Sequence, residues 1–309
     1  MKYFLGLDGG ATKTEGVIID EQEKLVAHII GGPVNYHQGG EEETKHNLEK
    51  VIEESLVQAN LKIEEISFAV LGLAGRDTKK DEKILDEIAR HLFNGSFREK
   101  IEVVSDVEIA YKATITRDYG IVLISGTGAN CFAKGKNGQV AWAGDWGWLL
   151  GDQGSGFALG LGALKRVMRE FDGRGPATSL TRLILAKLGL GQASDLSHWV
   201  YQKEIPIKDI AGLAPLVFEA YKRGDKVAQN LVNKLVVEMV ISLEVVAKKT
   251  NLLREKFEIG LVGGVFKEKL VVELFKERIK QTLPKAKLVL SGMEPALVAA
   301  IMAKNFKHV

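Results

Sequence analysis

The chain has 309 residues, of which 46% are hydrophobic and 27% are charged, and its formal net charge is +2 at pH 7. This balance gives no electrostatic reason to expect nucleic acid or an anionic membrane as a partner, and no run of about 20 apolar residues predicts a membrane span. Cys131 is the only cysteine, which excludes an intrachain disulfide and a multi-cysteine metal or iron–sulfur site within one chain. Because a predicted strand begins almost at Met1, we expect no signal peptide and a cytoplasmic protein.

The first 115 residues alternate apolar runs with helical patterns. Three strands are predicted first, and a glycine-rich turn follows the first of them. A glycine-flanked loop leads into a helix with apolar residues at helical spacing. The predicted strands are 3–8, 15–20, 24–30, 66–73 and 101–105, and the predicted helices are 41–60, 79–93 and 106–113.

From Tyr119 the same order begins again, which predicts duplication of one βββαβαβα unit. Two strands flank a second glycine turn, and a glycine-rich stretch then runs from Gly144 to Gly162. The chain reads as mostly helical from there to about residue 250. The predicted elements are strands at 120–125, 129–134, 139–142, 258–262 and 287–290 and helices at 180–188, 207–223, 225–249, 268–282 and 294–305.

The two glycine turns are the strongest functional signal. Each follows a buried-looking strand and combines glycines with hydroxyl residues, a composition that makes anion-binding concavities. Either turn alone is also compatible with an ordinary hairpin. The first turn does not fit a Walker pattern, and no dinucleotide-binding pattern opens a helix after the first strand. The pair therefore suggests two related halves that bind a polyphosphate.

The motifs resemble those of the sugar kinase, actin and heat-shock ATPase superfamily. Within it they are most similar to the N-acetylglucosamine kinases of the BadF/BadG/BcrA/BcrD ATPase family. The resemblance is carried in order by Leu7–Thr14, Asn35, Gly72–Gly75, Ser105-Asp106, Ile124–Cys131, Gly144–Gly147, Leu150–Ser155 and Gly263–Val265. It implies two ribonuclease H-like, actin-like α/β domains with an interdomain cleft: residues 1–115 with the C-terminal helix 293–309, and residues 116–292 with a helical insertion.

The resemblance implies ATP and Mg²⁺ as cofactors. Asp8 would hold the magnesium ion through water, although a carboxylate that caps the turn is the alternative. Thr127 would contact phosphate, and Lys13 could point to phosphate or to solvent. The expected nucleotide-binding residues are Gly9, Gly10, Ala11, Thr12, Lys13, Thr14, Gly126, Thr127, Gly128, Gly263, Gly264 and Val265.

Asp106 is the candidate catalytic base, because a carboxylate at a strand end can accept the proton of an attacking sugar hydroxyl. The alternative from the residues alone is a helix N-cap. The resemblance also implies a set of sugar contacts: Asn35, Tyr36, Asp106, Asn130, Gly144, Asp145, Trp146 and Asp152.

Five positions in or beside this set have a second interpretation or depart from the family pattern. Core packing is an alternative for Trp146 and is favoured for Trp148, and Cys131 reads as a buried hydrophobe. Tyr36 and Gln153 depart from the family pattern, where His and Glu are frequent, and both leave the preferred hexose open.

The expected activity is transfer of the γ-phosphate of ATP to the 6-hydroxyl of a hexose or amino sugar, with N-acetylglucosamine first and glucosamine or glucose next. An ATPase activator of an acyl-CoA reductase is disfavoured, because even a homodimer would supply only two cysteines to an iron–sulfur cluster. A sugar sensor or filament former is the non-catalytic alternative. We expect a homodimer with a small-molecule sugar as substrate.

Overall fold

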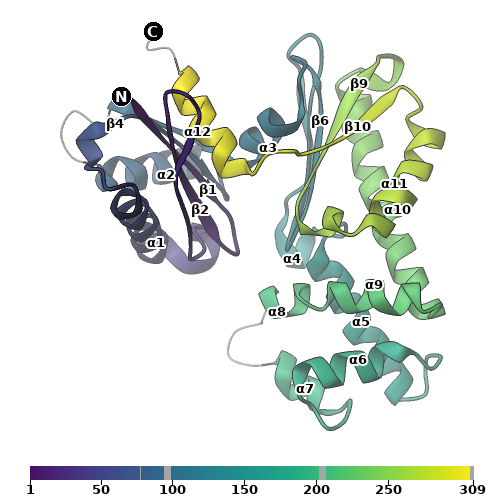
Figure 1. The fold of residues 1–309 in the computed structure, drawn as a ribbon. Coiled ribbons are helices and arrows are strands. Elements are labelled where there is room, and N and C mark those ends of the chain that lie inside the picture. Colours follow the sequence, from purple (N-terminus) through teal and green to yellow (C-terminus); the bar gives the residue numbers. More distant parts are fainter. Residues whose placement is uncertain (77, 94–98, 202–206, 307–309) are drawn as a thin grey trace. The chain divides into compact units, whose positions relative to one another are not determined.

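The chain folds into two compact units in the computed structural model, which describes residues 1–76, 78–93, 99–201 and 207–306 (Figure 1). Unit 1 consists of Met1–Thr114 and Ser291–Val309, and unit 2 of Ile115–Leu290. No helix in these described ranges combines the length and the apolar character that a membrane crossing requires. The functional roles assigned to the two domains stay predictions.

Unit 1 is built on a five-stranded mixed sheet in the order β3-β2-β1-β4-β5. The first three strands form an antiparallel meander, and β4 and β5 are parallel to β1. Its strands are β1 (Tyr3–Gly9), β2 (Thr14–Asp20), β3 (Leu25–Gly31), β4 (Ile66–Leu73) and β5 (Ile101–Ser105).

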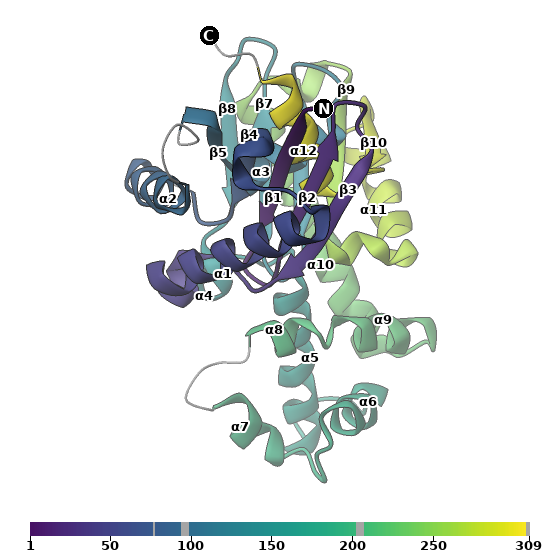
Figure 2. The same ribbon diagram turned by 60° about the vertical axis from the view of Figure 1, so that its left-hand side comes forward.

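Helices cover both faces of this sheet. Along β1, Leu5 and Leu7 join the core beneath α1 and α2, whereas Phe4 joins the core beneath α3 and α12, as the two-residue period of a strand requires. Figure 2 shows α1 in front of β1 to β3 and α12 behind them. The helices are α1 (Tyr36–Ala59), η1 (Ile63–Glu65), α2 (Lys79–Leu92), α3 (Asp106–Thr114) and α12 (Pro295–Asn305).

Unit 2 repeats this topology. Its sheet has the order β10-β9-β6-β7-β8, with β6 to β8 antiparallel and β9 and β10 parallel to β6. The predicted duplication is thereby confirmed. The strands are β6 (Gly120–Ser125), β7 (Ala129–Lys134), β8 (Val140–Gly144), β9 (Phe257–Val262) and β10 (Ala286–Leu290).

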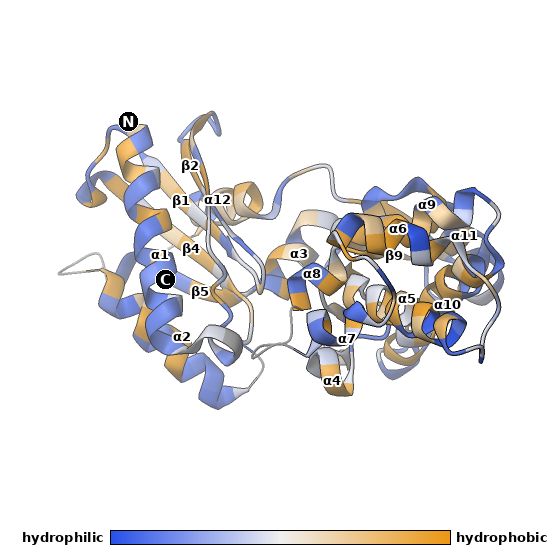
Figure 3. Ribbon diagram, turned by 90° about the horizontal axis from the view of Figure 1, so that it is seen from below, coloured by the Kyte–Doolittle hydropathy of each residue, from blue (hydrophilic) through white to orange (hydrophobic). Residues whose placement is uncertain are grey.

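A helical insertion separates β8 from α10 in unit 2. In Figure 3 its helices carry hydrophobic bands on a hydrophilic background, the pattern of helices that bury one face. The helices of unit 2 are α4 (Gly147–Leu150), α5 (Gly156–Phe171), α6 (Ser179–Leu188), α7 (Asp195–Val200), α8 (Ile207–Ala211), α9 (Ala214–Lys222), α10 (Lys226–Lys249), η3 (Leu252–Arg254), η4 (Gly264–Lys267) and α11 (Lys269–Thr282).

Glycines account for the main differences from the predicted elements. Helix α1 includes Tyr36, but Gly40, at φ 80° and ψ 173°, interrupts it before the long helical run. Helix α5 begins at Gly156, inside the glycine-rich stretch from Gly144 to Gly162, whereas the mostly helical region was expected only after that stretch. A Cβ on Gly160 would lie 1.9 Å from the carbonyl oxygen of Ile210, so this glycine permits close packing of α5 on α8 rather than a turn.

The helix predicted over 207–223 is two helices, α8 and α9, with Gly212 and Leu213 between them. Pro215 lies at the start of α9, where proline is tolerated because its missing N–H would be unpaired at that position in any case.

Candidate active site

The first glycine loop connects β1 and β2 as a tight hairpin. The Gly10 N–H donates to the Lys13 carbonyl at 2.9 Å, and the Gly10 carbonyl accepts from Val34 at 3.1 Å. A Cβ on Gly9 would lie 2.3 Å from the Val34 side chain, so only glycine fits there. The Thr14 hydroxyl is buried and donates to the Gly32 carbonyl at 2.6 Å. Gly10 and Thr14 therefore have structural contacts, and the nucleotide roles predicted for the loop stay predictions.

Asp8 lies in an acidic and dry environment at the end of β1. It faces Glu15 directly in the antiparallel pair of β1 and β2, and Asp106 begins the helix that covers the same face of the sheet. Burial, together with the negative charges of Asp106 and Glu15, raises the pKa of Asp8 to about 7, against the opposing effect of Lys13. A cation beside Asp8 would relieve this repulsion.

These side chains fit a magnesium ion that is held jointly with phosphate. No group of three His, Cys, Asp or Glu residues within the described ranges could hold a metal ion by itself. Mg²⁺ in kinase sites is usually bound by one or two carboxylates, water and the substrate phosphates. Asp8 supplies such a carboxylate, and burial together with the neighbouring carboxylates of Asp106 and Glu15 raises its pKa.

Glu15 is a residue that the sequence reasoning missed. It is 5% exposed and forms an ion pair with Lys13, and its other oxygen lies 3.5 Å from Nε2 of His28. The hydrogen bond with Glu15 is the main reason why the pKa of Lys13 is raised. The sequence signal was a carboxylate at the start of the otherwise apolar strand β2, and the register of β1 and β2 places it opposite Asp8.

Asp106 is the first residue of α3, as predicted. One of its carboxylate oxygens accepts from the N–H of Val107 at 2.8 Å, while Ser105 Oγ accepts from the N–H of Glu108 at 3.1 Å. The capping of the first turn is thus shared with Ser105. The structure brings Asp106 and Asp8 together on one face of the unit 1 sheet. Its role as base stays a prediction.

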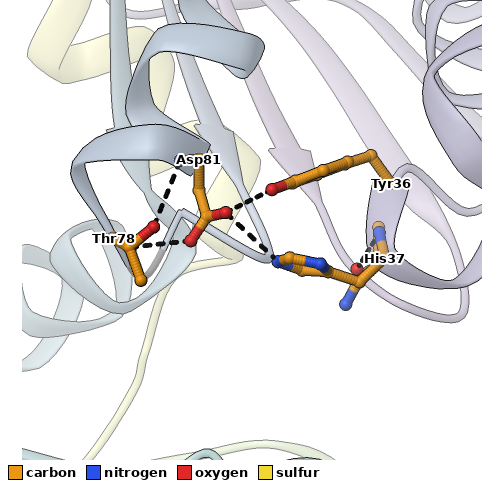
Figure 4. A network of polar contacts seen from close by, with 5 residues as sticks. Tyr36, His37, Thr78 and Asp81 are labelled. Atoms are coloured by element: carbon orange, nitrogen blue, oxygen red, sulfur yellow. Dashed lines mark hydrogen bonds and ion pairs between the residues drawn. The ribbon is translucent and has the colours of Figure 1, made fainter.

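Asn35 and Tyr36 belong to a polar network between the starts of α1 and α2 (Figure 4). Asn35 is the N-cap of α1 and accepts from the N–H of His37 at 3.1 Å. The Tyr36 hydroxyl donates to Asp81, and Nε2 of His37 lies 3.6 Å from the same oxygen. Burial raises the pKa of Asp81, but the hydrogen bonds from Tyr36 and Thr78 outweigh it, and the net shift is downward.

The position of Asn35 explains why residue 75, in the turn after β4, is a glycine. Gly75 has φ 80°, and a Cβ there would lie 3.1 Å from Oδ1 of Asn35. The amide oxygen of Asn35 is thus occupied by the helix cap, and its predicted sugar contact stays a prediction. The Tyr36 hydroxyl is directed to Asp81, which gives it a positioning contact.

The second glycine loop, between β6 and β7, is fixed by the start of α5. The N–H groups of Gly156 and Phe157 donate to the carbonyls of Gly126 and Thr127 at 2.8 and 3.3 Å. The Gly126 N–H donates to Gly128 within the loop at 2.9 Å. These backbone hydrogen bonds hold the loop against α5, and its phosphate contacts stay predictions.

Four of the predicted sugar contacts meet in unit 2. Asn130 donates through Nδ2 to Asp145 at 2.7 Å, and the Ala129 N–H donates to Asp152 at 3.1 Å. Asp152 is 8% exposed and has φ 61°. Burial raises its pKa, although the Ala129 hydrogen bond lowers it. A pocket of unit 2 is lined by Asn130, Gly144 and Asp152.

The nearby side chains of Trp146, Trp148 and Cys131 differ in how far they are buried. Trp146 is 72% exposed, so core packing does not explain it. Trp148 packs against the core and meets Phe157 edge-on at 5.7 Å, as expected. Cys131 is fully buried, and burial raises the pKa of its thiol. A thiol enclosed in this way does not reach a cluster between subunits, which argues further against the activator alternative.

The predicted adenosine motif follows β9. Gly263 has φ 110°, and a Cβ there would lie 2.3 Å from the carbonyl oxygen of Ser125. This close approach requires glycine and places the motif beside the second glycine loop. Gly264 begins η4, and a Cβ there would meet no atom within 4 Å. Val265 is buried.

Comparison with known proteins yields full-length relatives. A family model described as the BadF/BadG/BcrA/BcrD ATPase family matches residues 5–303. The chain is 33% identical over 306 residues to an N-acetylmuramic acid/N-acetylglucosamine kinase of Clostridium acetobutylicum, covering 99% of both chains. It is 30% identical over 317 residues to an N-acetyl-D-glucosamine kinase of Dictyostelium discoideum, again covering 99% of both.

One solved structure has the same fold over nearly the whole chain. It is a Chromobacterium violaceum protein proposed to be an N-acetylglucosamine kinase, and it superposes with a TM-score of 0.80 at 23% identity. The superposition covers 98% of this chain and 99% of that one.

Proposed function

Because the chain belongs to the BadF/BadG/BcrA/BcrD ATPase family, we propose that it is an ATP-dependent sugar kinase that phosphorylates N-acetylglucosamine. The observation that carries the proposal is the pair of full-length relatives, 33% and 30% identical to this chain, that are both named for kinase activity on this sugar. The meeting of Asp8, Asp106 and the first glycine loop in unit 1 supports it.

In the proposed reaction Asp106 accepts the proton of the sugar 6-hydroxyl as its oxygen bonds to the γ-phosphorus, and the bond from that phosphorus to ADP breaks. Asp8 would hold Mg²⁺ through water, and the ion would spread the charge of the phosphates. Asn35, Asn130 and Asp152 would orient the sugar hydroxyls, and the turn after β9 would receive the purine.

The remaining features of the proposal concern partners. The substrate is a small-molecule sugar, and we expect the protein to act as a homodimer. Glucosamine and glucose are the next substrates to consider, because the position of Tyr36 and the amide of Gln153 leave the choice of hexose open.

The test is release of ADP from ATP and magnesium with a panel of sugars. The panel contains N-acetylglucosamine, N-acetylmannosamine, glucosamine, glucose and mannose, with a control without sugar and an Asp106→Asn variant. We expect strong dependence on N-acetylglucosamine, and a loss of about 10²- to 10⁴-fold in kcat in the variant. ADP release that is the same with and without every sugar would overturn the proposed function.

A further inference from the structure

The pocket of unit 2 holds a side-chain atom without a partner. Asn130 is 7% exposed, and within the described residues no donor reaches its Oδ1. Its orientation is fixed, because Nδ2 donates to Asp145 and an ionised carboxylate only accepts. A buried amide oxygen without a hydrogen bond is costly, so Asn130 presents an acceptor that a ligand would satisfy.

Helix α10 brings two further polar side chains to this pocket. Glu238 and Ser242, one turn apart, line it together with Asn130 and Asp152. The Ser242 hydroxyl donates to the carbonyl of Glu238 at 3.1 Å, so toward the pocket it offers mainly lone pairs. No sequence motif indicated a site on α10, because its apolar residues at helical spacing predict only an amphipathic helix.

The charge in this pocket has one sign. Asp152 and Glu238 contribute carboxylates, and none of the described residues that line the pocket is Lys, Arg or His. The lining side chains with an amide N–H to donate are Gln153 and Asn130, and one of the two N–H groups of Asn130 already donates to Asp145. The pocket therefore suits a group that donates hydrogen bonds, such as a hydroxyl, an amide N–H or an ammonium group, and opposes a carboxylate.

We propose that this pocket receives the hydrogen-bond-donating substituent of the sugar, and that Glu238 selects against sugars with a carboxylated substituent. The inference rests on the proposed function and refines it. One relative is named for both N-acetylmuramic acid and N-acetylglucosamine, and these sugars differ by a carboxylate-bearing ether. Glu238 makes this chain a poor kinase for the first and a good one for the second.

The test compares N-acetylmuramic acid with its carboxamide, which has nearly the same shape without the charge. ADP release gives kcat/KM for each, with N-acetylglucosamine as reference. We expect the wild-type enzyme to use the carboxamide at least about ten-fold better than the acid, since two like charges near a protein surface repel by a few kcal/mol.

Variants assign this preference to one residue. Glu238→Gln, and in parallel Glu238→Ala, should bring the ratio of carboxamide to acid to within about three-fold of one. Glu244→Gln removes the same charge from α10 outside the pocket and should keep the wild-type ratio. If neither compound is phosphorylated, their inhibition constants against N-acetylglucosamine give the same ratio.

The outcomes separate the inference from the proposed function. Equal use of acid and carboxamide by the wild type, no binding of the carboxamide, or an unchanged ratio in a folded Glu238 variant overturns the inference while N-acetylglucosamine is still phosphorylated. No sugar-dependent ADP release by the wild type overturns the proposed function.

Discussion

At the scale of single residues, Asp8 shows how burial and charge prepare a site for a cation. Its strand position places it opposite Glu15 and on the face covered by α3. Burial and these neighbours raise its pKa to about 7 from 3.8. An acid with a raised folded-state pKa stabilises the fold below its unfolded pKa and loses that contribution as the pH rises through its folded pKa.

Asp8→Asn should therefore stabilise the metal-free protein more at pH 8 than at pH 5. The difference is on the order of 3 kcal/mol at most, from 1.36 kcal/mol for each pKa unit. Thermal melts in EDTA at the two pH values measure it, with Glu21→Gln on the exposed β2–β3 turn as control. An equal gain in stability at pH 5 and pH 8 would contradict the raised pKa of Asp8.

Alanine substitutions at Gly263 and Gly264, in the turn predicted to receive the purine, should have different effects. Gly263→Ala should lower the melting temperature strongly, because its φ is 110° and its Cβ would lie 2.3 Å from the Ser125 carbonyl oxygen. Gly264→Ala has room for the methyl group and should fold like the wild type. If the purine lies on this turn, Gly264→Ala should still raise the KM for ATP, and an unchanged KM would count against that position.

At the scale of elements, the starts of α1 and α2 are joined by a carboxylate. Asp81 caps α2 together with Thr78 and also accepts from Tyr36 of α1. Tyr36, which directly follows the Asn35 cap, is thus bonded to a helix that begins more than forty residues further along the chain. The predicted sugar contact, Asn35, and the cap of α1 therefore belong to the same short segment.

Tyr36→Phe removes one hydrogen bond to a buried carboxylate. It should cost about 1.5–3 kcal/mol of stability and raise the KM for the sugar several-fold, with kcat little changed, because Asn35 is displaced and Asp106 is not. Denaturant unfolding and steady-state kinetics measure the two effects. Tyr3→Phe, at an exposed hydroxyl, is the control. A fall in kcat with constant KM would place Tyr36 in the chemical step instead.

At the scale of the whole molecule, the chain returns to unit 1 at its end. Ala296, Ala299, Ala300 and Ala303 of α12 are buried in the core of unit 1 beneath Phe4 and Val17. Close packing is possible because β1 carries glycine at position 6, where a Cβ would lie 2.1 Å from the Ala300 nitrogen. Unit 2 has a core of its own.

Truncation after Leu290 should therefore destabilise unit 1 and spare unit 2. Loss of α12 exposes one apolar face of the unit 1 sheet, whereas the residues of the unit 2 core all remain. Calorimetry should show that the unfolding transition of unit 1 is lost and that of unit 2 is retained. Limited proteolysis should likewise leave only the unit 2 fragment intact. Loss of both, or retention of both, would contradict this division.

The sequence by itself determined the strands, the duplicated order and the positions of the glycine turns. These depend on local patterns: apolar alternation, helical spacing and the turn preference of glycine. Asp106 at the start of a helix and Cys131 in the core were predicted for the same reason. Local patterns did not reveal the start of α5, where Gly160 serves close helix packing inside the glycine-rich stretch.

Only the tertiary structure decided which side chains face one another. Glu15 opposite Asp8, Tyr36 on Asp81, and Glu238 beside Asn130 each join residues from different elements, and strand register or helix packing sets each contact. A carboxylate in a sequence has no visible neighbours, whereas its pKa and its hydrogen bonds depend on them. The chemistry assigned to the sugar pocket therefore required the fold.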